Sequence, residues 1–304
     1  MIHNAATAIA GCTARWGRRF RLPLLPAAVG LLQAATYTSA GFIEWPATAQ
    51  IGALSSVAVS GNHIYVLHRG EPPILEFDKK GTYQKGFGEG LFKVAHGLRV
   101  DPTGAIWTTD NGNHVIRKFS PDGKLLLTLG EVNVGGAGPD HFRSPDDIVI
   151  SSKGLPFYVE FGANKVASID PQTMVIREWT LPNADSRPRR LAIDANDVIW
   201  YSDYSRGFLG RLDPATGTVS EWPSPGGRQA QPYGIAVING MVWYSESGVQ
   251  PNTVVRFDPK TEPFQTWKIP SGGGVVRNVS VTKEGNLVLA ESGVNKIALV
   301  EIGR

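Results

Sequence analysis

The sequence has little cysteine, and it has no acidic residue near its start. Cys12 is the one cysteine among 304 residues. The chain after it therefore has no disulfide, no cysteine nucleophile and no cysteine-ligated metal. Residues 1–40 lack Asp, Glu and Lys but hold four Arg, then an apolar run over 22–35 and the small residues Thr38-Ser39-Ala40. That order of cationic, apolar and small residues predicts a secretory signal peptide over residues 1–40.

The apolar run of this predicted signal is shorter than the about 20 residues that a transmembrane helix needs. We therefore expect a periplasmic or secreted protein with no membrane span after signal removal. Without the four Arg of residues 1–40, the formal charge changes from +3 to −1. A near-neutral body offers no electrostatic basis for binding nucleic acid or anionic membranes. We expect a monomer whose partner is a small molecule or a peptide.

Long amphipathic helical patterns are also missing, whereas 35 Gly and 21 Pro supply turns. What is present is a unit of four short strands that recurs six times. Its first strands, 41 to 50 residues apart, start at Ser55, His96, Asp146, Arg189, Tyr233 and Arg277. This spacing is typical of propeller blades, and its regularity argues against a β-sandwich. The sequence predicts an all-β, six-bladed β-propeller over residues 41–304, with four-stranded blades.

The last repeat is one strand short at the C-terminus. It stops after its third strand, over residues 297–302. The segment Phe42–Pro46 contains Glu44-Trp45, which resembles the ends of other fourth strands at Glu178-Trp179 and Glu221-Trp222. We expect this N-terminal strand to close the last blade, because an unpaired sheet edge is a liability. The tryptophans that recur with the repeat are expected to pack between blades; they are Trp45, Trp179, Trp222 and Trp267.

Two rings of side chains are predicted at one mouth of the central channel, where first strands start and second strands end. The first ring consists of the six first-strand starts. The second ring consists of His68, Asp110, Glu160, Asp203, Glu246 and Glu291. The acids of the second ring have two interpretations. They accept hydrogen bonds from backbone N–H groups or pair with arginines, or some of them bind a divalent cation or hold a general base.

Individual members of the first ring suggest roles in chemistry. His96 is the candidate acid or base, since imidazole titrates near neutrality; the alternative is a hydrogen-bonded histidine that lines the channel. Arg189 and Arg277 are candidates for binding a substrate carboxylate or carbonyl. The alternative for them is ion pairing with Asp146, Asp203 or Glu291.

Residues 155–302 resemble the streptogramin (virginiamycin B) lyases. The resemblance rests on Phe157–Lys165, Ile199–Asp203, Gln231-Pro232-Tyr233-Gly234 and Val242–Glu246. Those enzymes are propellers that open a cyclic depsipeptide by elimination, using Mg²⁺, and their active blade reads Glu-Pro-His-Gly followed by a Glu. The resemblance places Gln231 at a metal-linked Glu, Tyr233 at the catalytic His, and Glu246 at the second Glu. It implies Mg²⁺ with Glu246 as a ligand. Together with the acids of the second ring, this predicts a divalent cation, Mg²⁺ or Ca²⁺, held by Glu246 with Glu160, Asp203 and Glu291.

Residues 52–130 resemble the NHL repeats of the peptidyl-hydroxyglycine amidating lyases. The shared phrases are His68-Arg69-Gly70, His96-Gly97-Leu98 and Ile106–Asp110. The resemblance implies that Arg69 contacts substrate, that His96 binds zinc and that Leu98 offers a carbonyl to calcium. Zinc in that family needs two more His at first-strand starts. This chain has none there, so its three-His zinc site is not rebuilt.

Together these patterns predict a lyase-like propeller of the streptogramin lyase superfamily that acts on a small ester, lactone or peptide-like substrate. His96 and Tyr233 are the predicted catalytic residues. The predicted substrate-binding residues are Arg69, Asp146, Arg189 and Arg277. Two alternatives stay open: a non-catalytic NHL-type binding module, and a metal-dependent lactone hydrolase of the gluconolactonase type.

Overall fold

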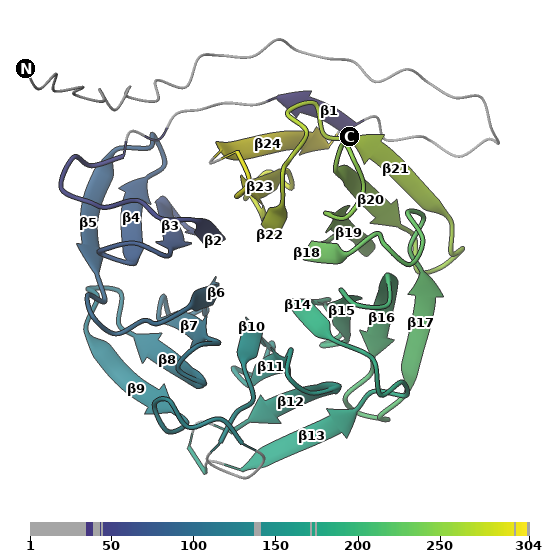
Figure 1. The fold of residues 1–304 in the computed structure, drawn as a ribbon, viewed down its shortest axis with the longest axis horizontal. Coiled ribbons are helices and arrows are strands. Elements are labelled where there is room, and N and C mark those ends of the chain that lie inside the picture. The colour runs from purple at the N-terminus through teal and green to yellow at the C-terminus, as the bar shows by residue number, and fades with distance from the viewer. Residues whose placement is uncertain are drawn as a thin grey trace, which may run out of the picture.

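Six four-stranded antiparallel sheets form a ring around a central axis (Figure 1). The computed structural model describes residues 35–38, 43, 45–136, 141–170, 172–173, 175–294 and 296–302. Every regular element in these ranges is a strand. The structure therefore confirms the predicted all-β, six-bladed β-propeller with four-stranded blades.

Five blades run from the innermost to the outermost strand in chain order. The first blade contains β2 (Leu54–Ser60), β3 (His63–His68), β4 (Ile74–Asp78) and β5 (Tyr83–Phe87). The second contains β6 (Ala95–Val100), β7 (Ile106–Asp110), β8 (Val115–Phe119) and β9 (Leu125–Leu129). The third contains β10 (Pro145–Ile150), β11 (Pro156–Glu160), β12 (Lys165–Ile169) and β13 (Ile176–Thr180). The fourth contains β14 (Pro188–Ile193), β15 (Ile199–Asp203), β16 (Phe208–Leu212) and β17 (Val219–Pro223). The fifth contains β18 (Pro232–Ile238), β19 (Met241–Glu246), β20 (Thr253–Phe257) and β21 (Phe264–Lys268). The sixth contains β22 (Val276–Val281), β23 (Leu287–Glu291), β24 (Lys296–Ile302) and β1 (Ala35–Thr38).

Local sequence explains how a blade turns back on itself, as the link between β6 and β7 shows. The carboxylate of Asp101 accepts hydrogen bonds from the backbone N–H groups of Thr103 (2.9 Å) and Ala105 (3.0 Å). Gly104 has a φ of 85°, a left-handed conformation that suits glycine. This Asp-Pro-Thr-Gly turn delivers the chain to Ile106 and Trp107, whose types favour strands and whose side chains are buried.

Each innermost strand carries a β-bulge close to its start. The register of pairing with the second strand shifts between Leu54 and Ser56 in β2, and at the corresponding place in the other five. The shifts fall at the first-ring residues, with Tyr233 sharing its shift with Gly234. A bulge leaves a residue outside the regular ladder and re-aims its side chain. The ring predicted from the repeat is therefore a ring of bulged residues.

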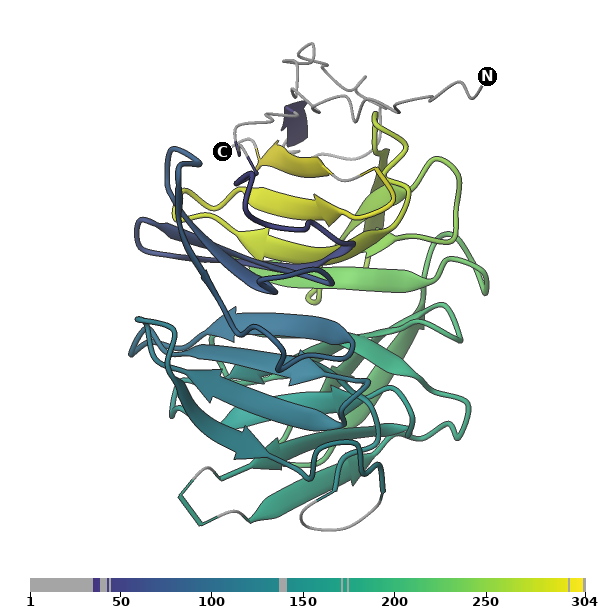
Figure 2. The ribbon, with the colours of Figure 1, turned by 60° about the vertical axis from the view of Figure 1, so that its left-hand side comes forward.

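Buried aromatic residues pack neighbouring blades together, as predicted for the tryptophans. Trp222 lies 4.9 Å, between ring centroids, from Phe257 of the next blade. Trp179 and Trp267 belong to apolar clusters that also include residues of the following blade. Trp45 packs edge-on against Phe77 at 5.9 Å, in the cluster between the last blade and the first. Figure 2 shows these two blades side by side.

The last blade is closed from the N-terminal side, but by a different segment from the one predicted. β1 pairs with β24, with Ala35 opposite Ile302 and Thr38 opposite Leu299. Phe42 and Glu44 lie outside the described residues, and Ile43, Trp45 and Pro46 are not in a strand. The assignment of Phe42–Pro46 to the closing strand was therefore wrong. Residues 36–38, Thr-Tyr-Thr, are of types that favour strands, whereas Trp45 is held by its contact with the first blade.

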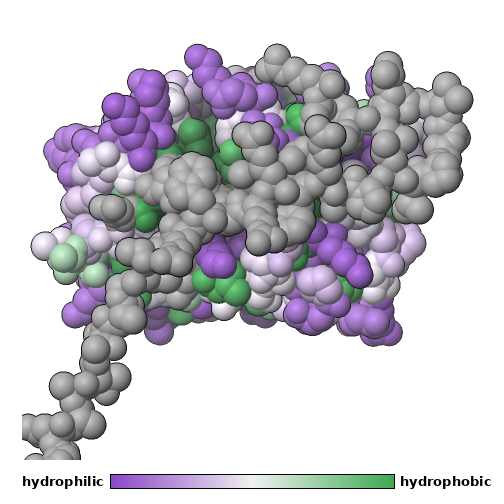
Figure 3. Space-filling model, turned by 90° about the horizontal axis from the view of Figure 1, so that it is seen from above, coloured by the Kyte–Doolittle hydropathy of each residue, from purple (hydrophilic) through white to green (hydrophobic). Residues whose placement is uncertain are grey.

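The rim nearest the chain ends is mainly hydrophilic, with hydrophobic residues in small separate groups (Figure 3). Scattered groups of this size are normal on a protein surface. Within the described ranges, no helix has the length and apolarity needed to cross a membrane.

Candidate functional site

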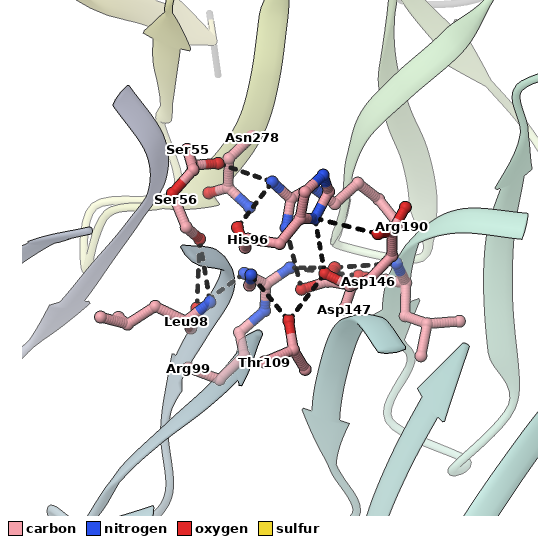
Figure 4. Close-up of polar contacts among 12 residues, drawn as sticks. Ser55, Ser56, His96, Leu98, Arg99, Thr109, Asp146, Asp147, Arg190 and Asn278 are labelled. Atoms are coloured by element: carbon pink, nitrogen blue, oxygen red, sulfur yellow. Dashed lines mark hydrogen bonds and ion pairs between the residues drawn. The ribbon is translucent and has the colours of Figure 1, made fainter. Parts of the chain in front are cut away.

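The centre of the ring is filled by Arg190, whose side chain is completely buried. Its Nε donates to the carbonyl oxygen of Arg277 at 2.7 Å, and its Nη2 donates to the carbonyls of Ser55 (2.6 Å) and His96 (3.0 Å). Its Nη1 lies 3.3 Å from Oδ1 of Asp147 (Figure 4). One guanidinium from β14 thus joins the innermost strands of four other blades.

Asp147 is shared between two arginines. Its Oδ2 accepts a hydrogen bond at 3.0 Å from Nη2 of Arg99. Arg99 also donates to the carbonyls of Leu98 (2.9 Å) and Leu191 (3.3 Å). Two guanidinium groups, those of Arg99 and Arg190, therefore face one carboxylate. The middle of the channel carries an excess of one positive charge and is occupied by polar side chains, which separate the two mouths.

His96 and Tyr233 meet at the mouth where the innermost strands begin. Nδ1 of His96 lies 2.7 Å from the carbonyl oxygen of Asp146, and Nε2 lies 3.1 Å from the hydroxyl oxygen of Tyr233. A carbonyl oxygen only accepts, so Nδ1 carries the proton and Nε2 accepts the hydroxyl hydrogen of Tyr233. The structure brings together two residues 137 positions apart. Both side chains are buried beneath the mouth.

Arg189 lies beside this pair in a cage of aromatic rings. Its guanidinium carbon is 4.2 Å from the ring centroid of Phe161, 5.1 Å from that of Tyr204 and 4.9 Å from that of Tyr233. Its Nη1 is 3.4 Å from Oδ2 of Asp146. Cation–π contacts and the ion pair hold this side chain in one orientation. The ion pair is the alternative that the sequence left open for Arg189.

Two further arginines face the same mouth. Nη1 of Arg277 is 3.5 Å from the hydroxyl oxygen of Tyr233, and its Nε donates to Oγ of Ser292 at 2.6 Å. Nε of Arg69 donates to the carbonyl of Ala95 at 3.3 Å. Burial lowers the pKa of Arg69, and the nearby charge of Arg277 lowers it further. A cluster of like charges of this kind favours the binding of an anionic group.

Burial and positive charge set the protonation of the groups beneath the mouth. Burial lowers the pKa of His96 well below its ordinary value, and the charges of Arg190 and Arg189 lower it further. His96 is therefore neutral at physiological pH and acts as a hydrogen-bond acceptor. Burial raises the pKa of Asp146, while the charge of Arg189 opposes that rise.

The acids of the second ring hold loops rather than pointing at a shared centre. Oε1 of Glu246 accepts hydrogen bonds from Oγ of Ser224 and the backbone N–H of Gly226, both at 2.6 Å, and Oε2 accepts from Thr253. Asp203 accepts from the backbone N–H of Arg187 at 3.0 Å. Hydrogen bonds of this kind, with backbone N–H groups as donors, are one of the two interpretations that the sequence left open for the second ring.

The other members of this ring are similarly engaged. Glu291 accepts a hydrogen bond from Oγ of Ser271 at 2.7 Å, and the backbone of Arg143 bonds Glu160. Within the described ranges, no three His, Cys, Asp or Glu side chains form a group that could hold a metal ion. Among the described residues, the four acids predicted to bind a cation, Glu246, Glu160, Asp203 and Glu291, do not gather into a group of three or more ligands. Both ring nitrogens of His96, for which the resemblance implies a zinc role, are hydrogen-bonded.

Sequence reasoning missed the residues that organise the channel: Arg99, Asp147, Phe161, Arg190 and Tyr204. Asp147 and Arg190 each follow a first-ring residue, in the pairs Asp146-Asp147 and Arg189-Arg190. Both pairs stand at the start of a first strand, where a β-bulge re-aims a side chain, so their two charges can face different parts of the channel. That doubling was the signal that could have found them.

Residues 92–119 match the model of the NHL repeat family. They cover β6, β7 and β8, and include His96. The chain is 26% identical over 170 residues to a probable peptidyl-α-hydroxyglycine α-amidating lyase of Caenorhabditis elegans. The aligned region covers 47% of this chain and 49% of that protein. The chain thus spans about half the length of this curated relative.

Two solved structures share the fold. Virginiamycin B lyase from Staphylococcus aureus aligns with a TM-score of 0.66 and 20% identity, over 82% of this chain and 81% of that one. A gluconolactonase from Xanthomonas campestris aligns with a TM-score of 0.65 and 14% identity, over 95% and 99%. At these identities the likeness concerns the propeller fold.

Proposed function

We propose that this propeller is a lyase-like enzyme that acts on a small ester, lactone or peptide-like substrate at the mouth that contains Tyr233. The observation that carries the proposal is the grouping of Arg69, Arg189 and Arg277 around a buried Tyr233–His96 pair. The three arginines provide three positive charges against the one carboxylate of Asp146. A substrate carboxylate or carbonyl would bind these guanidinium groups, which suit planar oxygen pairs.

In this proposal Tyr233 removes a proton from the substrate, and His96 positions it. Arg277, 3.5 Å from the hydroxyl oxygen, and Arg189, above the ring, would stabilise the ionised phenol. The hydroxyl of Tyr233 passes its proton to Nε2 of His96 while the phenol oxygen takes a proton from the substrate carbon. The electron pair of that C–H bond forms a double bond, and the bond to the leaving oxygen breaks. The proton on His96 then returns through Tyr233 to the leaving oxygen, which restores the neutral imidazole and the phenol. Arginines near the substrate carbonyl would stabilise the negative charge that develops there.

Access to Tyr233 constrains this mechanism. Tyr233 is only 1% exposed, and it lies against the half-buried side chains of Arg189 and Arg277. Substrate would reach the phenol oxygen when the guanidinium group of Arg277, whose Nη1 is 3.5 Å from that oxygen, turns to bind substrate. Arginine fits this task because its long side chain can move while its head group stays charged.

The test is turnover by Tyr233→Phe and His96→Ala. A streptogramin B depsipeptide is the substrate that tests the elimination step. A peptidyl-α-hydroxyglycine, whose C–N bond breaks as its hydroxyl loses a proton, and an aldonolactone, whose ester is opened by water, test whether the same mouth converts the other two substrate classes. We expect each substitution to reduce kcat about 10²–10⁴-fold, the usual contribution of a positioned acid or base. Tyr233→Phe keeps the ring that contacts Arg189, so it tests the hydroxyl alone. Full turnover by Tyr233→Phe on a substrate that the unaltered protein converts would refute the proposal.

A second candidate function is a non-catalytic binding module. It is favoured by the ion-paired network of Arg99, Asp147 and Arg190, which fills the centre of the channel. This candidate predicts saturable binding of a carboxylate-bearing peptide without any product. Mass spectrometry of the recovered peptide after long incubation distinguishes the two functions.

A further inference from the structure

The channel has a second mouth, at the ends of the innermost strands remote from His96. A cavity of about 470 Å³ opens there. Its lining comes from all six innermost strands, so it lies on the axis of the ring. Five half-buried aliphatic side chains, one from each of five strands, form its rim: Val100, Ile150, Ile193, Val237 and Val281. We define the second mouth by these five residues together with Arg99.

The floor of the second mouth is cationic. Arg99 lines the cavity, with 18% of its side chain exposed. Its two terminal nitrogens are bonded to the carbonyls of Leu98 and Leu191 and to Asp147. Asp147 is also paired with the fully buried Arg190. Two arginines share the carboxylate of Asp147, and Asp101, an acid of the lining, is paired with Lys118 at 3.5 Å. The floor therefore keeps one uncompensated positive charge.

The second mouth therefore combines apolar walls with a charge of +1 beneath them. We propose that it binds a free monocarboxylate with a compact hydrocarbon body, the carboxylate toward Arg99 and the hydrocarbon against the aliphatic rim. The volume falls in the range of about 300–1,000 Å³ that holds small organic ligands. Along β14, the two-residue step from Leu191, a carbonyl partner of Arg99, to Ile193 spans about 7 Å. A medium-length chain such as octanoate spans that depth.

The aliphatic rim and the cationic floor of the second mouth lead to separate predictions about which ligands bind. Each CH₂ group of the ligand that is buried against the aliphatic rim contributes about 0.8 kcal/mol, which corresponds to a gain in affinity of about fourfold. Affinity should therefore rise about fourfold per CH₂ from butanoate to octanoate. The charge on the floor predicts that octanoate binds more tightly than octanol, and that octylamine does not bind.

Isothermal titration calorimetry of the whole protein with these probes tests the proposal. We expect one octanoate per chain. Arg99→Gln should weaken octanoate binding about tenfold or more, because it removes the charge-assisted contact. Ile193→Asn and Val237→Asn should flatten the dependence on chain length. If one of these wall variants does not fold, the other carries the test.

Matched controls lie on the outside of the ring. Arg177→Gln removes one exposed charge on β13, and Val175→Asn alters a valine that is 64% exposed. Neither should change octanoate affinity. Equal binding of octanoate and octylamine, or unchanged binding in Arg99→Gln and both wall variants, would overturn the proposal. Binding to phosphatidylglycerol vesicles without binding of free octanoate would also overturn it, because the second mouth would then contact a lipid surface.

Discussion

Glu160 shows how strongly a single position in a blade can alter the chemistry of a side chain. Burial, and then the nearby charge of Glu178, raise the pKa of Glu160 from 4.5 to about 7. In the folded protein this carboxyl stays protonated between these values, whereas in the unfolded chain it ionises. The free energy of unfolding therefore has its full value below about pH 4.5. As the pH rises toward 7, it falls by the amount that this one carboxyl contributes.

This titration predicts the behaviour of Glu160→Gln. The variant should match the unaltered protein near pH 4 and exceed it near pH 8, by up to about 3 kcal/mol of unfolding free energy. Urea unfolding at both pH values measures the difference. Val175→Asn, at an exposed side chain that does not titrate, serves as the control and should show no such divergence. A constant difference between Glu160→Gln and the unaltered protein across this pH range would contradict the prediction.

At the scale of elements, the closing strand makes a specific contribution to the last blade. β1 pairs with four residues of β24, over Ala35–Thr38. A protein of residues 41–304 lacks this strand, and one of residues 35–304 keeps it. We expect the shorter protein to lose roughly 1–4 kcal/mol of unfolding free energy, because each net hydrogen bond contributes about 0.5–1.5 kcal/mol. Denaturant midpoints and slopes of the two proteins, measured side by side, check this.

Equal stability of the two proteins would show that β1 contributes little to closure. The comparison also mimics the chain before and after removal of the predicted signal, since β1 lies inside residues 1–40. Removing Trp45 by Trp45→Ala in both proteins is a useful control. Its contact with Phe77 does not depend on β1, so its effect should be the same in each.

The elements also show what the sequence can and cannot predict. The repeat located the innermost strands and the ring that contains His96 and Tyr233, because each blade solves the same packing problem with the same residue types. It misplaced the closing strand, because Glu44-Trp45 and residues 36–38 both carry strand signals and only pairing with β24 decides between them. It left the roles of the acids open, since a carboxylate that binds a loop and one that binds a cation look alike in sequence.

Only part of the candidate site could be predicted from the sequence, and the reason is geometric. Strand alternation and bulges decide which of two adjacent charges enters the channel, as with Arg189 and Arg190. Arg189 contacts three aromatic rings at the mouth, whereas Arg190 is buried on the axis. Phe161 and Tyr204 come from loops that follow second strands, and their positions depend on blades that are distant in sequence.

At the scale of the whole molecule, Arg190 is the residue that unites the ring. Arg190→Lys keeps the charge but cannot reach the carbonyls of Ser55, His96 and Arg277 together. We expect it to lower the unfolding free energy by about 3–5 kcal/mol, as breaking a buried ionic network does. Chemical denaturation checks this, with the exposed Arg177→Lys as the control. An unfolding midpoint for Arg190→Lys equal to that of Arg177→Lys would refute the central role of Arg190.

Pairing of β1 with β24 has a consequence for how the protein is made. Residue 35 pairs with residue 302, so the first strand to leave the ribosome finds its partner after nearly the whole chain has been synthesised. The five blades between them can form in order from neighbouring strands, but the ring closes last and against the largest loop entropy. Until then the edge of β24 that β1 covers presents unpaired backbone, which is open to aggregation. The interval between release of β24 and its pairing with β1 is therefore the period in which a growing chain most needs a chaperone.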